Sequence, residues 1–480
     1  MIEKRVLEKI KEIVGKENFF DSPEERVTYS YNGTPILENI PDAVVRPSNV
    51  KQLMEIVSLA NEEKFGIVPR GSGTGLSGGS IPSDNSIVLL LNHWNQILEI
   101  DAENLTATVE PGVITEKVHQ EVEKIGLFYP PDPGSASICT IGGNVAENAG
   151  GLRGLKYGVT RNYVMGLEVI LPTGAIINIG GKVVKNAAGY SLKEIFVGSE
   201  GTLAIFTKIL LKLIPKPEQT GTLLAFFERI GDAGRTVSSI ISSHIIPSTL
   251  EFLDGLTIKC VEEYTGIGLP INAGALLLIE VDGPASVVEY EAEKIEEICL
   301  KNKAIQVKRA KTEKEAVQLK AARKSAFSAL ARIKPTTILE DVTVPRSEVA
   351  NIIEKIQRIA DKYHVTIGNF GHAGDGNLHP TCLTDERDKE EIERAEKALE
   401  EIFRAAVACG GTITGEHGVG LAKKRFLPEV AGNEAIEIMR KFKTLLDPNN
   451  VLNPGKVISV SPRCEGINKN ILFQKHTPEG

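Results

Sequence analysis

The sequence has few cysteines, and they lie far apart. Six occur in 480 residues, at positions 139, 260, 299, 382, 409 and 464. No two of them are closer than 27 residues, so the chain lacks the C-x-x-C spacing of zinc ribbons and iron–sulphur sites. The same wide spacing is unlike the disulfide framework of small secreted proteins. We therefore expect separate reduced thiols, most of them in the core.

Excess positive charge and long apolar runs are also missing. The 55 Lys and Arg residues are outnumbered by 63 Asp and Glu residues, which gives a net charge of −8. This balance, without a basic run, argues against a nucleic-acid-binding surface. No apolar stretch reaches the roughly 20 residues of a membrane-spanning helix. The first 19 residues, MIEKRVLEKIKEIVGKENF, predict an amphipathic helix and not a signal peptide. We expect a cytoplasmic protein, either free or held at a membrane through a partner.

The pattern of helices and strands predicts more than one domain. A chain of 480 residues is long for a single core. A helix capped by Ser48 ends near Gly66, and a short strand at 67–68 follows it. Further strands are predicted at 86–91, 106–111, 164–171 and 175–179. After residue 217 the pattern changes to alternating helices and strands, and the predicted elements are a strand at 276–281 and helices at 287–302, 312–332, 388–409 and 435–446. We therefore place a domain boundary near residue 218.

The stretch from Gly66 to Ser80, GIVPRGSGTGLSGGS, contains a match to the dinucleotide pattern G-x-G-x-x-G. A Rossmann turn requires a helix directly after these glycines. Here GGSIPSDN follows, which is rich in helix breakers and leads into a strand. The Walker pattern also fails, because no Gly-Lys-Ser/Thr follows. Such a loop is either a flexible connection or a nest of backbone N–H groups for an anion. Two more glycine-rich segments, 130–154 and 186–201, favour one long ligand that passes several stretches of backbone.

These three segments carry a resemblance to a known family. In this order, PRGSGTGLSGG, PPDPGSASICTIGGNVAENAGGLRGLKYG and KNAAGYSLKEIFVGSEGTL resemble the FAD-binding domain of the vanillyl-alcohol oxidase superfamily. Over residues 38–457 the chain is most similar to the FAD-linked D-2-hydroxyacid dehydrogenase family. The resemblance implies an α+β fold, with a two-subdomain (PCMH-type) FAD-binding domain and a ferredoxin-like α/β substrate (cap) domain. We expect a helical N-terminal segment at 1–37, the FAD domain at 38–217, the cap at 218–425, a C-terminal return to the FAD domain at 426–458, and a tail at 459–480.

The resemblance also implies which residues hold FAD. They come from the three segments and from the C-terminal return: Arg70, Gly71, Ser72, Gly73, Thr74, Gly75, Ser137, Thr140, Gly142, Gly143, Asn144, Gly150, Gly201, Ile205 and Asn453. Some members of the superfamily attach the flavin covalently through a histidine or cysteine. The first loop contains neither residue type, and Cys139 in the second segment is a weak candidate. We expect noncovalent FAD.

Three of the eight histidines lie in two short glycine-rich strings. In GHAGDGNLH, His372 and His379 are seven residues apart, and the two glycines between them permit a tight turn that brings both imidazoles to one point. In GEHG, Glu416 and His417 are adjacent. Two imidazoles and a carboxylate suit Zn²⁺, Mn²⁺ or Fe²⁺ and leave positions for a substrate. We therefore predict a divalent-metal site at His372, His379 and Glu416, the set that the family uses. Asp375 competes as a ligand, but we expect it to brace the turn or an imidazole N–H.

The remaining candidates concern the substrate. His417 is left beside the predicted metal, and the resemblance implies that it takes the hydroxyl proton of a 2-hydroxyacid while hydride passes to the flavin. Its alternative role is a supporting hydrogen bond. Arg323 lies in a predicted helix, where an arginine is usually a charged side chain exposed to solvent. The resemblance implies instead that Arg323 binds the substrate carboxylate.

Substrate size and electron acceptor are predicted less directly. The D-2-hydroxyglutarate branch of the family carries polar residues where Phe327, Leu339 and Thr381 stand. A small acid, D-lactate or glycolate, is therefore favoured over D-2-hydroxyglutarate. Because the chain has no iron–sulphur motif, we expect an iron–sulphur subunit, an electron-transfer flavoprotein or a quinone to take the electrons. Two alternatives stay open: a metal-free sugar or alcohol oxidase on the same FAD fold, and a metal-dependent hydrolase or binding protein whose glycine loops hold a phosphate ligand.

Overall fold

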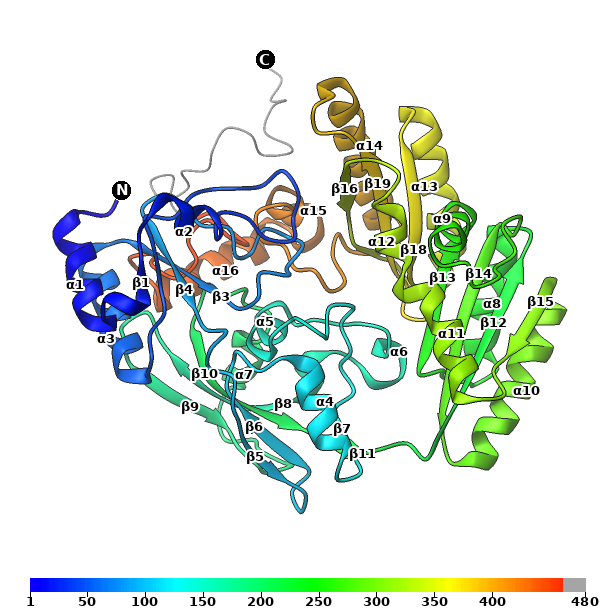
Figure 1. Cartoon of the computed structure of the whole chain (residues 1–480), viewed down its shortest axis with the longest axis horizontal. Coiled ribbons are helices and arrows are strands. Elements are labelled where there is room, and N and C mark those ends of the chain that lie inside the picture. Colours follow the sequence, from blue (N-terminus) through cyan, green and yellow to red (C-terminus); the bar gives the residue numbers. More distant parts are fainter. Residues whose placement is uncertain (461–480) are drawn as a thin grey trace.

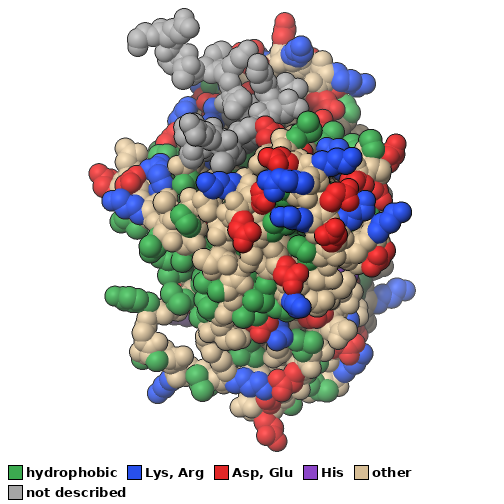
Figure 2. Space-filling view, turned by 90° about the vertical axis from the view of Figure 1, so that its left-hand side faces the viewer, with side chains coloured by type: hydrophobic (Ala, Val, Ile, Leu, Met, Phe, Trp, Pro, Cys, Tyr) green, Lys and Arg blue, Asp and Glu red, His purple; other side chains and the backbone are tan. Residues whose placement is uncertain are grey.

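The computed structural model describes residues 1–460. Cys464 and nearly all of the predicted tail therefore lie outside the described residues. Two parts stand side by side in Figure 1, one formed by the N-terminal half with α15 and α16, the other by α8–α14 and a large sheet. On the face drawn in Figure 2, Lys and Arg side chains are interspersed with Asp and Glu side chains, and hydrophobic side chains gather in the lower part of the view. None of the helices in residues 1–460 combines the length and apolar character that crossing a bilayer requires.

The first subdomain is a small sheet with strand order β1-β2-β4-β3, covered by helices. Its elements are α1 (Lys4–Val14), β1 (Phe19–Phe20), α2 (Pro23–Val27), β2 (Ala43–Val45), α3 (Val50–Glu63), β3 (Gly66–Arg70) and β4 (Ser86–Leu90). The predicted cap of α3 is off by one residue: Asn49, not Ser48, accepts the hydrogen bond from the N–H of Gln52, at 3.0 Å. Strand β3 runs parallel to β4, and the glycine loop joins them without a helix, which confirms that the G-x-G-x-x-G match is not a Rossmann turn.

The second subdomain is a five-stranded antiparallel sheet with order β5-β6-β10-β8-β9. The strands are β5 (Ile97–Asp101), β6 (Thr106–Val109), β8 (Val164–Ile170), β9 (Ile176–Gly180) and β10 (Ile205–Lys212), with a separate pair of β7 (Leu127–Phe128) and β11 (Ile214–Pro215). Its helices are α4 (Thr115–Glu123), α5 (Ile141–Glu147), α6 (Gly154–Tyr157) and α7 (Leu192–Phe196). The strands predicted in this region are all present.

The second part is built on an eight-stranded antiparallel sheet, which we call the cap sheet. Its order is β15-β12-β14-β13-β18-β19-β16, with β17 paired to β19. The strands are β12 (Gln219–Phe227), β13 (Thr249–Asp254), β14 (Ala275–Gly283), β15 (Ala304–Arg309), β16 (Thr336–Leu339), β17 (Val342–Thr343), β18 (Thr366–His372) and β19 (Asn377–Thr384). The predicted boundary near residue 218 falls directly before β12.

Helices cover both faces of the cap sheet and bury two apolar clusters against it. They are α8 (Ile230–Ser242), α9 (Gly255–Thr265), α10 (Ala285–Lys301), α11 (Glu313–Lys324), α12 (Ala326–Leu330), α13 (Val349–Tyr363) and α14 (Lys389–Ala408). The single helix predicted at 312–332 is in fact two, α11 and α12, with a break at Ser325. Serine favours helix ends because its hydroxyl competes for backbone hydrogen bonds.

The chain returns to the first subdomain after the cap. Helices α15 (Leu427–Ala431) and α16 (Asn433–Leu446) precede this return. The N–H of Ile67 in β3 then donates to the carbonyl of Val451 at 2.7 Å. The buried Lys443 ammonium donates to the carbonyls of Thr202 at 2.7 Å and Leu452 at 2.8 Å. The α+β fold is therefore completed by a C-terminal segment that lies against the strand before the first glycine loop.

Candidate active site

A hairpin in the cap sheet brings the two predicted histidines together. His372 ends β18, and His379 is the third residue of β19, which pairs antiparallel with β18. The turn between them requires glycine at 376, where φ is 86° and an added Cβ would stand 2.0 Å from the carbonyl oxygen of Val344. The two imidazole centroids are 5.1 Å apart, and both residues are buried. The tight turn inferred from the sequence is therefore present.

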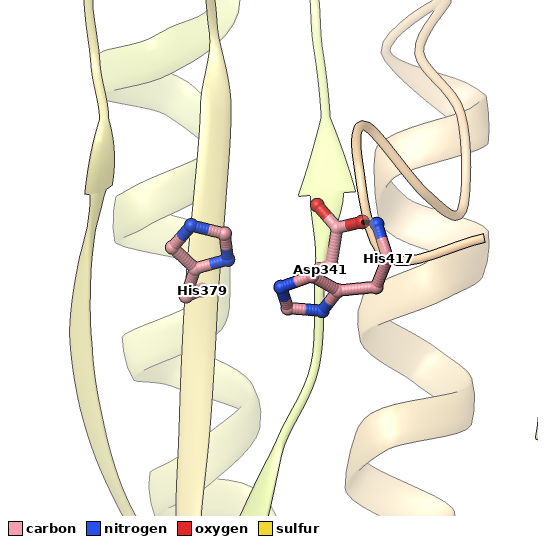
Figure 3. Close-up of side chains that lie close together, drawn as sticks. All are labelled: Asp341, His379 and His417. Atoms are coloured by element: carbon pink, nitrogen blue, oxygen red, sulfur yellow. Dashed lines mark hydrogen bonds between the residues drawn. The ribbon is translucent and has the colours of Figure 1, made fainter. Parts of the chain in front are cut away.

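Glu416 and His417 reach this hairpin from the loop after α14, residues 414–420, which we call the site loop. The Glu416 Oε1 atom lies 3.2 Å from His372 Nε2 and 3.3 Å from His379 Nε2. The His417 ring stacks on that of His379, with centroids 5.1 Å apart and planes 11° apart, and Figure 3 shows the two rings side by side. All four predicted side chains thus meet at one point.

Glu251, from β13, joins this cluster to Arg323. Its Oε1 lies 2.6 Å from His372 Nδ1, and its Oε2 accepts a hydrogen bond from Arg323 Nε at 2.5 Å. The guanidinium of Arg323 also stands 4.6 Å from the centroid of the Phe370 ring. Of the two roles expected for Asp375, bracing the turn fits, because its Oδ1 accepts from the N–H of Asn377 at 3.2 Å. The imidazole of His372 is instead held by Glu251.

Asp341, which follows β16, anchors the backbone of the site loop. Its Oδ2 accepts hydrogen bonds from the hydroxyl of Thr414 at 2.7 Å and from three backbone N–H groups at 2.8 to 3.0 Å, those of Gly415, Glu416 and His417. Its Oδ1 accepts from the side-chain amide of Asn377. Asp341 is fully buried and lies next to His417 and His379 (Figure 3). Its oxygens are therefore occupied by the backbone that carries Glu416 and His417.

The charges of the cluster suit a divalent cation. The candidate ligand atoms of His372, His379 and Glu416 lie within 4.8 Å of one another. Burial alone would raise the pKa of Glu416, but the neighbouring imidazoles hold it well below its usual value. Burial alone would lower the pKa of His372, but the carboxylates of Glu251 and Glu416 raise it well above its usual value. The Nδ1 atoms of His379 and His417 are buried without a hydrogen-bond partner in residues 1–460. A cation at this point would balance the two carboxylates.

His417 differs from the other two histidines. Burial lowers its pKa to about 4, against the opposing charges of Asp341 and Glu416, so its imidazole is neutral at neutral pH. Its Nε2 is 3.8 Å from Glu416 Oε1, a longer distance than that of either His372 or His379. A neutral imidazole beside the cluster can accept a proton.

The first and second glycine-rich segments lie against each other. A Cβ at Gly71 would stand 2.3 Å from the hydroxyl oxygen of Thr140, and Thr140 caps α5 by accepting from the N–H of Gly143 at 3.3 Å. Arg70 is buried, and its guanidinium donates to the carbonyl of Tyr31 at 2.7 Å. No carboxylate of the described chain forms an ion pair with Arg70. A buried cation in a glycine loop fits a phosphate-containing cofactor.

The third segment and the C-terminal return complete this region. The Asn453 side-chain amide donates to the carbonyls of Gly79 at 2.8 Å and Glu200 at 2.6 Å, so it links the first loop to the third segment. Its Oδ1, together with the hydroxyls of Ser77 and Ser199, is buried without a partner among the described residues. Unpartnered buried polar atoms around three loops fit a polar ligand that runs between them.

The other predicted FAD residues vary in how they are placed. Gly142 packs on Pro111, where an added Cβ would stand 2.7 Å from Pro111 Cβ, and the Asn144 amide donates to the hydroxyl of Thr115 at 2.7 Å. Ile205 begins β10 and is buried. A positive φ is adopted by Gly73 and Gly201. Ser72 and Ser137 are exposed, whereas intermediate burial is found at Gly71, Gly73, Thr74, Gly75 and Gly143.

Gly150, in the second glycine-rich segment, lies next to the histidine–glutamate cluster. A Cβ on Gly150 would stand 2.7 Å from Glu416 Oε2, so glycine is needed for the close approach of this carboxylate. The second glycine-rich segment therefore borders the histidine–glutamate cluster directly.

Sequence reasoning missed three carboxylates that organise the site: Glu251, Asp341 and Glu200. One signal was available for Glu251, since a carboxylate between Leu250 and Phe252 in an otherwise apolar strand requires a buried partner. No such signal was available for Asp341. It follows Glu340 directly after a strand, and two acidic residues at a strand end are typical of an ordinary exposed turn.

Two family profiles match the chain. "FAD linked oxidases, C-terminal domain" matches residues 216–457, and "FAD binding domain" matches residues 41–180. Among curated proteins, the chain is 57% identical over 463 residues to "Glycolate oxidase subunit GlcD" of Bacillus subtilis, covering 96% of this chain and 98% of that protein. It is 37% identical over 436 residues to "D-lactate dehydrogenase" of Archaeoglobus fulgidus, covering 90% and 95%.

Solved structures share the fold at low sequence identity. The 4-ethylphenol oxidase of Gulosibacter chungangensis superposes with a TM-score of 0.79 at 19% identity, over 96% of this chain and 97% of that one. The p-cresol methylhydroxylase structure gives a TM-score of 0.77 at 19% identity, over 95% and 97%. These likenesses confirm the FAD-binding fold that the glycine-rich segments predict.

Proposed function

Because this chain belongs to the family of FAD-linked oxidases, we propose that it oxidises a small D-2-hydroxyacid, D-lactate or glycolate, to the 2-keto acid. FAD and one divalent metal are its cofactors in this proposal. The observation that carries it is the cluster of His372, His379 and Glu416, whose ligand atoms lie within 4.8 Å of one another beside the flavin segment at Gly150. Relatives of similar length named for glycolate and D-lactate oxidation support the substrate class.

Each side chain has a task in this reaction. When bound, FAD accepts the hydride and the metal acts as a Lewis acid toward the hydroxyl oxygen. His372, His379 and Glu416 would hold the metal, and the neutral imidazole of His417 accepts the hydroxyl proton. Arg323 uses Nε to hold Glu251, and its Nη groups bind the substrate carboxylate.

A small substrate is supported by the side chains at the positions where the D-2-hydroxyglutarate branch carries polar residues. Phe327 and Leu339 carry no polar group, and the hydroxyl of Thr381 donates to the carbonyl of His379 at 3.0 Å. The ammonium of Lys320 lies 3.3 Å from Glu280 Oε1. We therefore assign no residue here to a second substrate carboxylate, which favours lactate or glycolate over D-2-hydroxyglutarate.

The flavin is held noncovalently in this proposal. Cys139 is buried, its Sγ lies 3.3 Å from Thr115 Oγ1, and burial raises the pKa of its thiol. A buried thiol with a raised pKa is a poor nucleophile. The described chain has no iron–sulphur motif, and one relative is named a subunit. We therefore propose that a partner protein, either an iron–sulphur subunit or an electron-transfer flavoprotein, or else a quinone, takes the electrons.

The test is to mix the yellow protein anaerobically with D-lactate, L-lactate, glycolate and D-2-hydroxyglutarate. We expect glycolate or D-lactate to bleach the flavin fastest, and the metal content to be one ion per flavin. Failure of all four acids to bleach it would reject the proposal. Reduction by these acids at full rate after the metal is removed would reject the metal as a cofactor and leave a metal-free oxidase on the same FAD fold. His417→Ala should keep FAD and slow bleaching by about 100-fold or more.

A further inference from the structure

The site loop is held from both domains by carboxylates. From the cap, Asp341 accepts the N–H groups of the loop up to His417. From the flavin domain, Glu200 accepts the N–H of Val419 to Oε1 and the N–H of Gly420 to Oε2, both at 2.7 Å. These two bonds are buried, and they join residues 219 and 220 positions apart. The backbone on either side of His417 is thus fixed to a different domain.

Glu200 makes this contact in a conformation that non-glycine residues rarely adopt. Its φ is 51°, in the left-handed region where an L side chain is strained. Its neighbours Gly198 and Gly201 also have positive φ, at 81° and 70°, so the segment turns sharply. The carbonyl of Glu200 is held by the side chain of Asn453 at 2.6 Å. Strained backbone conformations that the surrounding structure holds in place cluster at functional sites. The conformation of Glu200 therefore suggests a functional role.

The space for this contact depends on glycine at 418. A Cβ at Gly418, where φ is 82°, would stand 2.9 Å from Glu200 Oε1 and 2.2 Å from Glu147 Oε2. Glu147 fills the gap between this turn and Gly79 of the first glycine loop, where an added Cβ would stand 2.9 Å from Glu147 Oε1. Burial and the charge of Glu200 raise the pKa of Glu147 well above its usual value. Burial also raises the pKa of Glu200, to about 7, although the N–H groups of Val419 and Gly420 oppose this rise.

We propose that Glu200 is a positioning residue, which fixes the site loop to the flavin domain and thereby sets where the imidazole of His417 stands relative to the cofactor. The inference rests on the proposed function, because it concerns the same site. His417 is part of the cap sequence, whereas the glycine-rich segments belong to the other domain. A misplacement of about 1 Å between reacting groups can cost roughly 100-fold in rate. A direct bond between the flavin domain and this loop keeps that error small.

The test is Glu200→Gln, which keeps the side-chain length but turns an NH₂ group toward one of the two backbone N–H groups. We expect unchanged FAD content, and anaerobic flavin reduction by glycolate or D-lactate slowed by about 10- to 100-fold with little change in the half-saturating concentration. In a His417→Ala background the same change should cause no further loss, because Glu200 acts through His417.

The matched control is Asp282→Asn. Asp282 also joins the two domains, accepting from Lys156 at 2.5 Å and Tyr157 at 2.9 Å, and its loss should not slow reduction.

A Glu200→Gln protein that reduces its flavin as fast as wild type would overturn the proposal, as would a loss that adds in full to that of His417→Ala. Amide hydrogen exchange at Val419 and Gly420 provides a readout that needs no substrate. Both amides should be protected in the wild-type holoenzyme and exchange faster in the variant. If no hydroxyacid reduces the wild-type flavin, the proposed function fails, yet exchange still tests the contact. Unprotected amides in wild type would overturn the proposal even if the variant does not fold.

Discussion

At the scale of single residues, Glu251 has the most consequential position in the site. One of its oxygens holds the imidazole of His372 and the other holds Arg323. A carboxylate behind a metal-binding histidine fixes the ring and its tautomer, and loss of such a partner typically lowers metal affinity about 10- to 100-fold. Glu251→Gln should therefore weaken binding of the proposed divalent metal by that factor, measured with added Zn²⁺ in a chelator competition, while the FAD content stays the same.

The control for this variant is Glu280→Gln on the neighbouring strand β14. Glu280 contacts Lys320 and the hydroxyl of Thr222 and has no contact with the histidines. Equal zinc affinity in wild type and Glu251→Gln would show that Glu251 does not support a metal ligand.

Lys456 is a buried lysine whose titration should affect stability. Its Nζ has a carbonyl partner, Pro454, at 3.4 Å, and burial together with the charge of Lys424 lowers its pKa to about 7. The unfolded chain keeps this proton up to about pH 10.4, so between pH 7 and 10 the unfolded state binds more protons than the folded state. The free energy of unfolding should therefore rise with pH across this window, by at most about 1.4 kcal/mol per pH unit.

Lys456→Met removes this titration. The difference in unfolding free energy between wild type and Lys456→Met, measured by urea unfolding, should become more favourable to wild type from pH 7 to 10. A difference that does not change with pH would contradict a lowered pKa for Lys456.

At the scale of elements, the turn after α5 allows the flavin segment to meet the site loop. Gly150→Ala would place a methyl group 2.7 Å from Glu416 Oε2. Overpacking of this kind costs roughly 1–3 kcal/mol, which is enough to lower metal affinity roughly tenfold. We expect the proposed metal to be lost at a lower chelator concentration with FAD retained. Gly134→Ala is the control, because a Cβ there meets nothing within 4 Å. Loss of FAD with unchanged metal binding would contradict this prediction, because it would show that the added methyl group disturbs FAD binding and not Glu416.

Local sequence patterns predicted the elements of the site but not the links between them. The hairpin of β18 and β19 could be predicted because its glycines and histidines lie within one short string. Glu251 could not be assigned to His372, because the two residues are 121 positions apart and meet only through the pairing of β13 with β18. The contact of Glu200 with the site loop depends in the same way on the docking of two domains. Asp375 was placed correctly at the turn, since that role needs only its neighbours.

At the scale of the whole molecule, the site lies between the two parts of the chain, because Glu200 of the flavin domain accepts the N–H groups of Val419 and Gly420 in the site loop. The cap contributes the histidines, Glu251 and Asp341, whereas the other domain contributes Glu200 and the glycine-rich segments. Gly150 against Glu416 and Lys156 with Asp282 are further contacts across this boundary. Both parts belong to known families of FAD-linked oxidases. One profile matches residues 41–180, before the predicted boundary near residue 218, and the other matches residues 216–457.

The most direct measurement for the central claim is anaerobic flavin reduction by glycolate and D-lactate, followed by stopped-flow absorbance in metal-loaded and metal-stripped protein. The account predicts fast bleaching by at least one of the two acids in the loaded protein, and a loss of about 100-fold or more both on stripping the metal and in His417→Ala. A flavin that neither acid bleaches, or that is bleached equally fast without metal and without His417, would contradict it.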